Sequence, residues 1–598
     1  MSYNGMSDEV AKVILAEEAH RVGTVWRALD LDGDGIISAE EIDAAPASLR
    51  ALDTNGDGML TADELGGPFR YPGGQRSSAI VRILDLDGDG VITAEDIADS
   101  PARLRRLDRL GKGHLLPADD RPPPNPTVSQ SLGGPAHVVA QFDILRSYVD
   151  EPSGPVLPGT DPRQSDGYFL IYEHGNAGDV QIARDLFLMD RNGNRVHEWP
   201  HYLHPAEAVC PHLRDDGLLI RTGCPGIWLD AIHFPVGAHG VISLVEPDGA
   251  VVWEFRLFEP GRRVLHHDFE PMPNGNILVL VYEGRTFEEA AAIGWQEQTR
   301  EALMRPPDLQ RWWTEAVLEL EPDFDTGETR IVWEWHSSDH LVQNIDPGKS
   351  NFGQIGPGCR KIDINYTQYP RYRFNMGQVM HANAVSYDAQ RDQILLSSAM
   401  HGEMWVIDHG TTTTQARGER GDLLYRWGNP SSHQAGPESQ KILDWQHDIG
   451  WIPDGVPHEG HVLIFNNGAR RPGDDLPNPH PNRLSFTHDG YSELLEVRLP
   501  VDDEGRWTWD TADPLNGAEI VWAYNDDASK DWFSPFMSGA RRLPNGNTVS
   551  ALGYNKRIRE VTPDGETVLD FLPGGPGRTF RVVPIAADHP GLARLGLK

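Results

Sequence analysis

Residues 241–255 read VISLVEPDGAVVWEF, a strand-like run, a tight polar turn and a second strand-like run that ends in aromatic residues. β-branched and aromatic residues on either side of a Pro-Asp-Gly turn are typical of a β-hairpin. The same unit recurs, with different turn lengths, at 186–199, 317–335, 404–428, 483–524 and 556–571. The chain therefore repeats one antiparallel unit along most of its length.

A second signature lies between these hairpins. It is a turn followed by a β-rich strand, as in RDDGLLI (214–220), PNGNILVL (273–280), RDQILLSS (391–398) and PNGNTVSAL (544–552). Six copies of about four strands each predict an all-β, six-bladed β-propeller. One segment of helical composition, at about 286–316, interrupts the pattern and is expected to form a lid or side subdomain.

The N-terminal part carries a different repeat: residues 30–41 read DLDGDGIISAEE, 53–64 DTNGDGMLTADE and 85–96 DLDGDGVITAED. Calcium requires six to eight oxygen ligands, and an EF-hand loop supplies them from positions 1, 3, 5, 7, 9 and 12, with glycine at position 6. The three loops predict three Ca²⁺ sites, whose ligands are Asp30, Asp32, Asp34, the Ile36 carbonyl, Ser38 and Glu41; Asp53, Asn55, Asp57, the Met59 carbonyl, Thr61 and Glu64; and Asp85, Asp87, Asp89, the Val91 carbonyl, Thr93 and Asp96.

The third loop differs at its last position, where the shorter Asp96 replaces glutamate and predicts a weaker site that tolerates magnesium better. A fourth loop at 108–119, DRLGKGHLLPAD, places Lys112 at a ligand position and is expected to be empty. The apolar residues at position 8, Ile37, Leu60 and Ile92, suit a short β-bridge between paired loops. We expect an all-α module of two hand pairs in which calcium is mainly structural.

At 598 residues the chain is expected to contain two or more domains. The Pro-rich run around PPPNP (122–126) favours extended backbone, so we predict an EF-hand domain at 1–120, a linker and lead-in at 121–160, and the propeller at 161–598. A formal charge of −36 argues against nucleic acid or an anionic membrane as partner, and no apolar run approaches the length of a membrane span. Without a secretory signal, the chain as written is expected to be cytoplasmic.

Histidines recur at one register of the propeller repeat. Counting eight residues back from the turn glycine finds His267 in one blade and His447 in another, while His381 precedes the corresponding strand of a third. The first residues of inner strands face the central channel, so these imidazoles are expected to converge there. The aspartates that follow two of them, Asp268 and Asp448, either fix imidazole tautomers or cap turns.

Several segments resemble the bacterial aryl-sulfate sulfotransferase family: HHDFEPMPNGNILVL (266–280), MHANAVSYDAQRDQILLSS (380–398), GDLLYRWGNP (421–430), QHDIGWIPDG (446–455) and FSPFMSGARRLPNGNTVSA (533–551). The resemblance implies a six-bladed propeller that moves a sulfuryl group between phenols through a histidine intermediate. It implies His447 as the nucleophile, with His267 and His381 positioning the sulfate and handling the phenol proton. Phenolic or sulfated small molecules are the implied partners, and a periplasmic location if a leader was removed.

The sequence departs from that family after QILLSS, where Ala399 stands in place of the usual arginine and His401 follows two residues later. Arg360, Arg371, Arg373 or Arg541 are candidates to supply the missing cation. A second hypothesis is a transition-metal enzyme in which His267, His381, His401 and His447 form a four-imidazole centre, because imidazole suits zinc, copper or iron. A third is a non-catalytic, calcium-binding scaffold. The natural donor and acceptor and the oligomeric state stay open.

Overall fold

The computed structural model describes residues 24–32, 37–61, 64–65, 80, 84, 91–105, 115, 161–173, 185–199, 210–223, 235, 237–259, 261–296, 311–324, 326–366, 377–468, 492–502, 505–513, 516–526, 532–553, 556–572 and 578–597.

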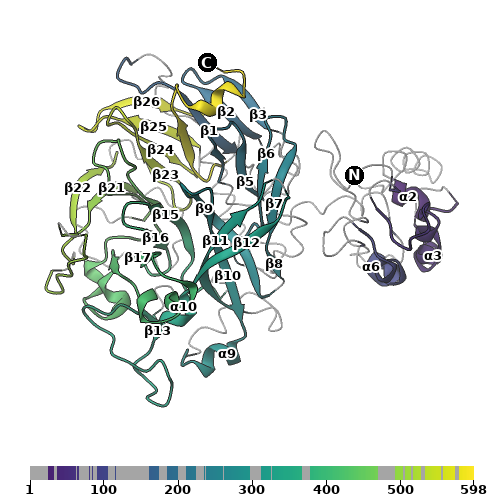
Figure 1. The fold of residues 1–598 in the computed structure, drawn as a ribbon, viewed down its shortest axis with the longest axis horizontal. Helices are drawn as coiled ribbons and strands as arrows, with labels where there is room; N and C mark the ends of the chain where they lie inside the picture. The colour runs from purple at the N-terminus through teal and green to yellow at the C-terminus, as the bar shows by residue number, and fades with distance from the viewer. Residues whose placement is uncertain are drawn as a thin grey trace, which may run out of the picture.

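Six antiparallel sheets, numbered here as blades 1 to 6, form a β-propeller (Figure 1). Blade 1 contains β27 (Val582–Ile585), β1 (Tyr168–Glu173), β2 (Asp185–Asp190) and β3 (Arg195–Trp199), and blade 2 contains β4 (His212–Leu213), β5 (Leu219–Gly223), β6 (Val241–Val245) and β7 (Val251–Arg256). Blade 3 contains β8 (Phe258–Glu259), β9 (Arg263–Pro271), β10 (Ile277–Arg285), β11 (Trp312–Pro322) and β12 (Thr329–His336). Blade 4 contains β15 (Ala382–Asp388), β16 (Gln393–Ser398), β17 (Glu403–Asp408) and β18 (Tyr425–Trp427). Blade 5 contains β19 (His447–Trp451), β20 (Val462–Asn466), β21 (Glu493–Arg498) and β22 (Glu519–Tyr524), and blade 6 contains β23 (Gly539–Arg542), β24 (Thr548–Leu552), β25 (Arg557–Val561) and β26 (Thr567–Phe571). The predicted six-bladed propeller is confirmed.

The ring closes through blade 1, which combines strands from both ends of the propeller sequence. Strand β27 pairs antiparallel with β1, with Tyr168 opposite Ile585 and Ile171 opposite Val582. Closure in this way joins the two ends of the propeller sequence within one sheet.

Pro-Asp-Gly turns form the hairpins for a local reason. Gly249 has φ +86°, a left-handed conformation that costs glycine little, and its N–H donates to the Glu246 carbonyl at 2.9 Å. The Asp248 side chain accepts from the Ala250 N–H at 2.9 Å, which fixes the turn between β6 and β7.

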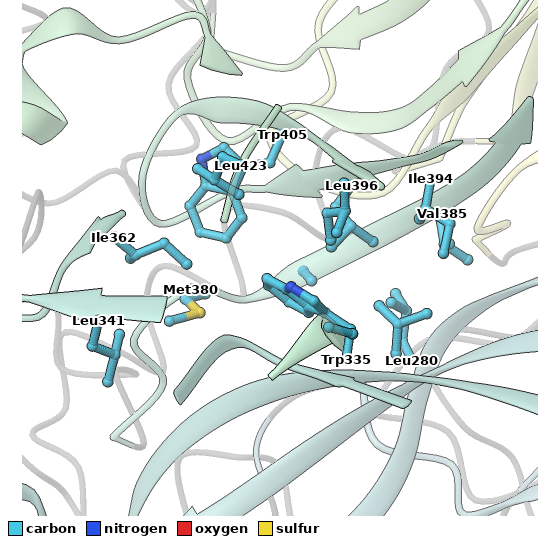
Figure 2. Packing of buried hydrophobic residues seen from close by; sticks show 14 of the residues in the cluster. Leu280, Trp335, Leu341, Ile362, Met380, Val385, Ile394, Leu396, Trp405 and Leu423 are labelled. Carbon is cyan, nitrogen blue, oxygen red and sulfur yellow. The ribbon is translucent and has the colours of Figure 1, made fainter. Parts of the chain in front are cut away.

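Apolar side chains fill the space between neighbouring blades. In the cluster between blades 3 and 4, Trp335 of β12 packs with Leu280 of β10 and Leu396 of β16 (Figure 2). The Trp335 indole also donates to the Gly421 carbonyl at 2.8 Å, so it joins the two blades by a hydrogen bond as well as by packing. Tryptophans of outer strands thus stabilise the contacts between blades.

The helical insertion is shorter than the sequence suggested. Helix α9 spans Phe287–Ala292 and is capped by Thr286, residues 297–310 lie outside the described residues, and β11 already begins at Trp312. The prediction of helix to residue 316 was wrong at its end, because Trp312–Ala316 is buried as a sheet strand rather than along one helical face. The remaining short elements are η4 (Ser337–His340), β13 (Leu341–Val342), β14 (Ile362–Asp363), α10 (Thr413–Ala416), η5 (Glu419–Gly421), η6 (Pro430–His433), η7 (Glu438–Gln440) and η8 (Pro590–Ala593).

The N-terminal part is helical, with α2 (Thr24–Leu29), α3 (Ala39–Arg50), α5 (Ala94–Ala98) and α6 (Ser100–Arg105). The expected bridges between loops are present: Leu60 pairs with Ile92, and Ile37 pairs with Leu115. Loop two therefore pairs with loop three, and loop one with the degenerate fourth loop. Within the described residues, the helices are all too short or too polar to cross a bilayer.

Candidate functional site

The inner strands of three blades carry a strained residue at the register that the sequence singled out. His267, His381 and Asp448 have φ of +47°, +52° and +53°, which side chains other than glycine rarely adopt. Strands β9, β15 and β19 each shift register against their neighbour at this point, as β-bulges do. Such bulges turn the side chains at these positions out of the regular sheet pattern.

The three imidazoles His267, His381 and His447 come together at this register. The rings of His267 and His381 meet edge to face with centroids 4.6 Å apart, and Phe580 lies 6.1 Å from the rings of both His267 and His447. Each histidine is only 3% exposed. Gly237, at φ +86°, passes so close to the His267 ring that a Cβ there would lie 1.9 Å from it, so the cluster requires glycine at this position.

The hydrogen bonds of His447 define its tautomer. Its Nδ1 faces two oxygen acceptors, the Asn467 Oδ1 at 2.9 Å and the Trp445 carbonyl at 3.0 Å, so Nδ1 carries the proton. The Met537 N–H donates to Nε2 at 3.2 Å, which leaves Nε2 with its lone pair. Asn467 is itself fixed, because its Nδ2 donates to the carbonyls of Ser534 and Met537 at 2.8 and 3.0 Å.

Burial keeps these imidazoles neutral. Desolvation lowers the pKa of His447 to about 4 and that of His381 to about 3, and it lowers the pKa of His267 well below its usual value. The neighbouring imidazoles add to the shifts of His267 and His381, because each would repel a second positive charge. At neutral pH the cluster is therefore uncharged and rich in nitrogen lone pairs.

Asp268 and Asp448 neither fix imidazole tautomers nor cap turns, the two roles considered for them from sequence. Arg581 lies between them, with its guanidinium 2.9 Å from Asp268 and 3.0 Å from Asp448, and Arg541 pairs with Asp448 from the other side. The two carboxylates also accept the N–H groups of Val385 and Ala540, at 3.2 and 3.0 Å. These aspartates thus tie neighbouring blades together.

Arg581 is a buried cation that the sequence analysis missed. Burial by itself disfavours its charge, but the two carboxylates raise its pKa above the usual range, so it stays ionised. Of the candidates named from sequence, Arg541 joins this ion-pair chain and Arg360 donates to the Leu423 carbonyl, while Arg371 and Arg373 lie outside the described residues. Ala399, where the family arginine was expected, is buried. Only the ring closure by β27 brings Arg581 here, and no local motif marks it.

Two further groups around the imidazoles were also missed. Glu315 lies 2.8 Å from His266 Nε2, in an alignment outside hydrogen-bond geometry, and His266 Nδ1 is 2.9 Å from His267 Nδ1. Burial raises the pKa of Glu315 well above its usual value, which favours the uncharged carboxyl. The doubled histidine in HHDFEP could have pointed to His266 from the sequence. Glu315 lies on β11, and no sequence pattern marked it as part of the site.

Tyr282 contacts His381 through its hydroxyl group. Its hydroxyl lies 3.2 Å from His381 Nδ1 and accepts from Gln378 Nε2 at 2.8 Å. The His381 ring also stacks on Trp445, with centroids 5.3 Å apart. Aromatic rings thus line the cluster beside the imidazoles.

His401 has a different environment from the other three histidines. Its Nδ1 is 3.0 Å from Ser398 Oγ, and its ring packs against Tyr366 and Trp405, with centroids 5.3 and 5.1 Å away. Across the described residues, which include all four histidines, the groups with ligand atoms within 4.8 Å of one another are His458–His461–Glu496 and Asp30–Asp32–Glu41. The geometry therefore gives no support to a four-imidazole metal centre.

The calcium loops have the local geometry that ligand sites require. In loop two, Asp53 accepts the N–H groups of Gly56 and Gly58 at 2.7 and 2.9 Å, and Glu64 accepts those of Thr54 and Thr61 at 3.1 and 3.0 Å. The other predicted ligands of this loop, Asn55, Asp57 and Met59, continue the same turn. In loop one, Asp30, Asp32 and Glu41 converge and Ser38 caps α3, while Asp34 and Ile36 lie outside the described residues.

Loop three shows a competing interaction at its last ligand. Asp85, Asp87 and Asp89 lie outside the described residues, but Val91, Thr93 and Asp96 are described. One oxygen of Asp96 accepts the Thr93 N–H at 2.8 Å, and the other pairs with Arg103 at 2.6 Å. Arg103 therefore competes with an ion for Asp96, which adds to the effect of the shorter side chain.

The fold and the site define a six-bladed propeller with buried histidines at its inner strands, joined in sequence to EF-hand motifs. Residues 233–568 match the arylsulfotransferase (ASST) family, and residues 27–44, 47–67 and 82–98 match the EF-hand family. The chain belongs to the arylsulfotransferase family and carries EF-hands of the calcium-binding type. No curated protein matches it.

Solved structures show only distant similarity. A protein of unknown function from Bacteroides caccae is 11% identical, with a TM-score of 0.35, covering 70% of this chain and 99% of its own. The periplasmic gluconolactonase PpgL of Pseudomonas aeruginosa is 11% identical, with a TM-score of 0.31, covering 70% and 99%. Virginiamycin B lyase of Staphylococcus aureus is 11% identical, with a TM-score of 0.28, covering 70% and 87%.

Proposed function

We propose that this protein transfers a sulfuryl group from an aryl sulfate to a phenol through a covalent sulfo-histidine at His447. The observation that carries the proposal is the meeting of His267, His381 and His447, with His447 neutral and its Nε2 bearing a lone pair. Membership of the arylsulfotransferase family supports the same reaction class. Trp445 and Phe580 lie beside the imidazoles, and their aromatic rings suit a donor and an acceptor that are themselves aromatic.

In the first half-reaction, the His447 Nε2 lone pair forms a bond to sulfur, and the sulfur–oxygen ester bond breaks. The electron pair leaves on the phenolate oxygen, which takes up a proton from His381, protonated when the anionic substrate binds. Nε2 must give up the 3.2 Å contact with the Met537 N–H, a loss of about 1 kcal/mol. The Asn467 and Trp445 oxygens hold the Nδ1 proton while the ring becomes positively charged.

In the second half-reaction, the acceptor phenol gives its proton to neutral His381, its oxygen attacks sulfur, and the nitrogen–sulfur bond breaks to return the electron pair to Nε2. His267 and His381 are neutral in the free protein. A bound sulfate ester is an anion and raises the pKa of nearby imidazoles, so His381 gains a proton-donating form when substrate binds. Tyr282 and Gln378 hold the His381 ring for that exchange.

The charge balance at the site distinguishes it from a strongly cationic sulfate pocket. Arg581 and Arg541 are paired with Asp268 and Asp448, so this ion-pair chain contributes no net positive charge. Sulfate recognition therefore depends on N–H donors and on imidazoles that become protonated with the substrate. Because no unpaired cation of this ion-pair chain binds the sulfate, we expect a high KM for simple aryl sulfates.

The test is turnover of 4-nitrophenyl sulfate with phenol as acceptor, read as release of 4-nitrophenol. We expect His447→Ala to abolish release and His401→Asn to retain it, since His401 lies apart from the cluster. Mass spectrometry of protein quenched with donor alone should show a sulfuryl adduct on His447. Activity in His447→Ala, or equal loss in both variants, would overturn the proposal.

A further inference from the structure

The turn between β19 and β20 carries a second group of ligating side chains, at the opposite end of these strands from His447. His447 pairs with Phe465, whereas Trp451 pairs with Val462 at the end where the turn begins. The turn is well tied down, because the Ile452 N–H donates to the His461 carbonyl at 2.8 Å and the Glu459 side chain accepts the Gly455 N–H at 2.8 Å. Whatever binds here does so independently of the sulfuryl site.

Three potential ligands from the turn and from β21 meet at one point. The Nδ1 atoms of His458 and His461 lie 2.7 and 2.6 Å from the same oxygen, Oε1, of Glu496. The side chain of Glu496 is fully buried, that of His461 is 22% exposed and that of His458 is 58% exposed. The group therefore has a buried carboxyl at its base and one side that is open to solvent.

The other oxygen of Glu496 is already engaged. Arg542 of β23, in the neighbouring blade, pairs with Oε2, donates to the Gly546 carbonyl at 3.0 Å and lies over the Trp522 ring at 5.0 Å. This fixes the carboxylate plane, with Oε1 directed at the two imidazoles. Partners of this kind, which hold a ligand in orientation, typically accompany metal ligands in proteins.

We propose that His458, His461 and Glu496 bind a divalent ion of the zinc class. Two imidazole nitrogens and one carboxylate oxygen are a donor set found in zinc sites that keep a fourth position for water. Calcium and magnesium prefer oxygen ligands, so the EF-hands do not compete for the same ion. Ligand bonds of about 2.0–2.1 Å in tetrahedral geometry separate ligands by roughly 3.3 Å, so each imidazole moves back by about 0.6 Å. Rotation of the two imidazole side chains supplies that shift, so the turn itself need not move.

The simpler alternative is that two imidazole N–H groups merely donate to a buried carboxylate. The two cases differ in what they bind, so the probe is Co²⁺, added to the full-length protein with Ca²⁺ in excess to fill the EF-hands. Tetrahedral Co²⁺ with nitrogen ligands gives an intense visible absorption, whereas Co²⁺ in an oxygen-only, six-coordinate loop absorbs weakly. Zn²⁺ should displace the Co²⁺ and remove the band.

We expect one equivalent of Co²⁺ to produce the band in the unaltered protein. His458→Ala and His461→Ala should each abolish it, and Glu459→Gln, which changes an exposed acid of the same turn, should leave it intact. The thermal midpoint of each variant in Ca²⁺ shows that the propeller is folded. The proposal fails if the unaltered protein shows no such band in excess Co²⁺, or if both histidine variants retain it. Neither result bears on sulfuryl transfer at His447.

Discussion

Two adjacent asparagines provide a sharp test of how His447 is held. Asn466 and Asn467 are both fully buried, and the side chain of each makes three hydrogen bonds. Asn467 contacts His447, whereas Asn466 contacts Asp444, Ile442 and Glu493 instead. Replacing either by alanine removes the same number of hydrogen bonds, but only one change reaches the proposed nucleophile.

The expected magnitudes follow from these contacts. Each variant loses three hydrogen bonds of about 1 kcal/mol, so the free energy of unfolding should fall by about 3 kcal/mol in both. The bond from His447 to Asn467 gains charge as the sulfo-imidazolium forms, and such bonds contribute about 1.5–3 kcal/mol. Since about 1.4 kcal/mol corresponds to a factor of ten in rate, kcat of Asn467→Ala should fall by roughly 10- to 100-fold. The Trp445 carbonyl, 3.0 Å from His447 Nδ1, remains in the variant as an acceptor, which favours a loss of kcat nearer 10-fold than 100-fold.

The assay is 4-nitrophenol release over a range of pH, together with urea unfolding of both variants. Asn467 raises the pKa of His447 against the larger effect of burial, so its removal should move the acid limb of kcat/KM from about pH 4 to lower pH. Asn466→Ala should keep both kcat and that limb. Equal kcat losses in the two variants, or an unchanged kcat in Asn467→Ala, would show that Asn467 does not support the charge on His447.

Three further outcomes are expected. Arg581→Met should lower the free energy of unfolding by about 3–5 kcal/mol, because the buried Asp268 loses its ion pair and Asp448 keeps only Arg541. Adding Asp268→Asn should recover part of this loss in urea titrations, and no recovery would contradict the ion-pair chain. His381 has a folded-state pKa of about 3, below the usual value of about 6.5, so the unfolded chain takes up its proton first. The free energy of unfolding should therefore fall as pH drops below about 6.5, by up to about 1.4 kcal/mol per pH unit from this residue. His381→Gln should flatten the slope of the urea midpoint against pH, and an unchanged slope would show that His381 does not cause the pH dependence. Arg103→Met should tighten the third Ca²⁺ site in calorimetric titration by freeing Asp96, and an unchanged third affinity would show that the ion pair does not compete.

Local sequence determined the elements of this protein and the pattern of its repeats. Pro-Asp-Gly turns between β-branched runs specify hairpins by their own backbone preferences, so VISLVEPDGAVVWEF and its relatives were sufficient to predict six blades. The calcium ligands are likewise spaced within twelve consecutive residues, and their chemistry is contained in the loop itself. The repeat also pointed to His267, His381 and His447, because it places equivalent residues at equivalent positions in each blade.

Tertiary structure decided what surrounds those residues. Arg581 reaches the two aspartates only because β27 closes the ring, and Glu315 reaches His266 from the strand beyond β10. The pairing of Glu496 with His458 and His461 joins residues 35 and more positions apart along blade 5. Contacts of this kind depend on which blades become neighbours and on where each strand stops, and no short-range pattern encodes either. The chain alone therefore determined which side chains were available for chemistry, and the closed ring decided which charges and hydrogen bonds they meet.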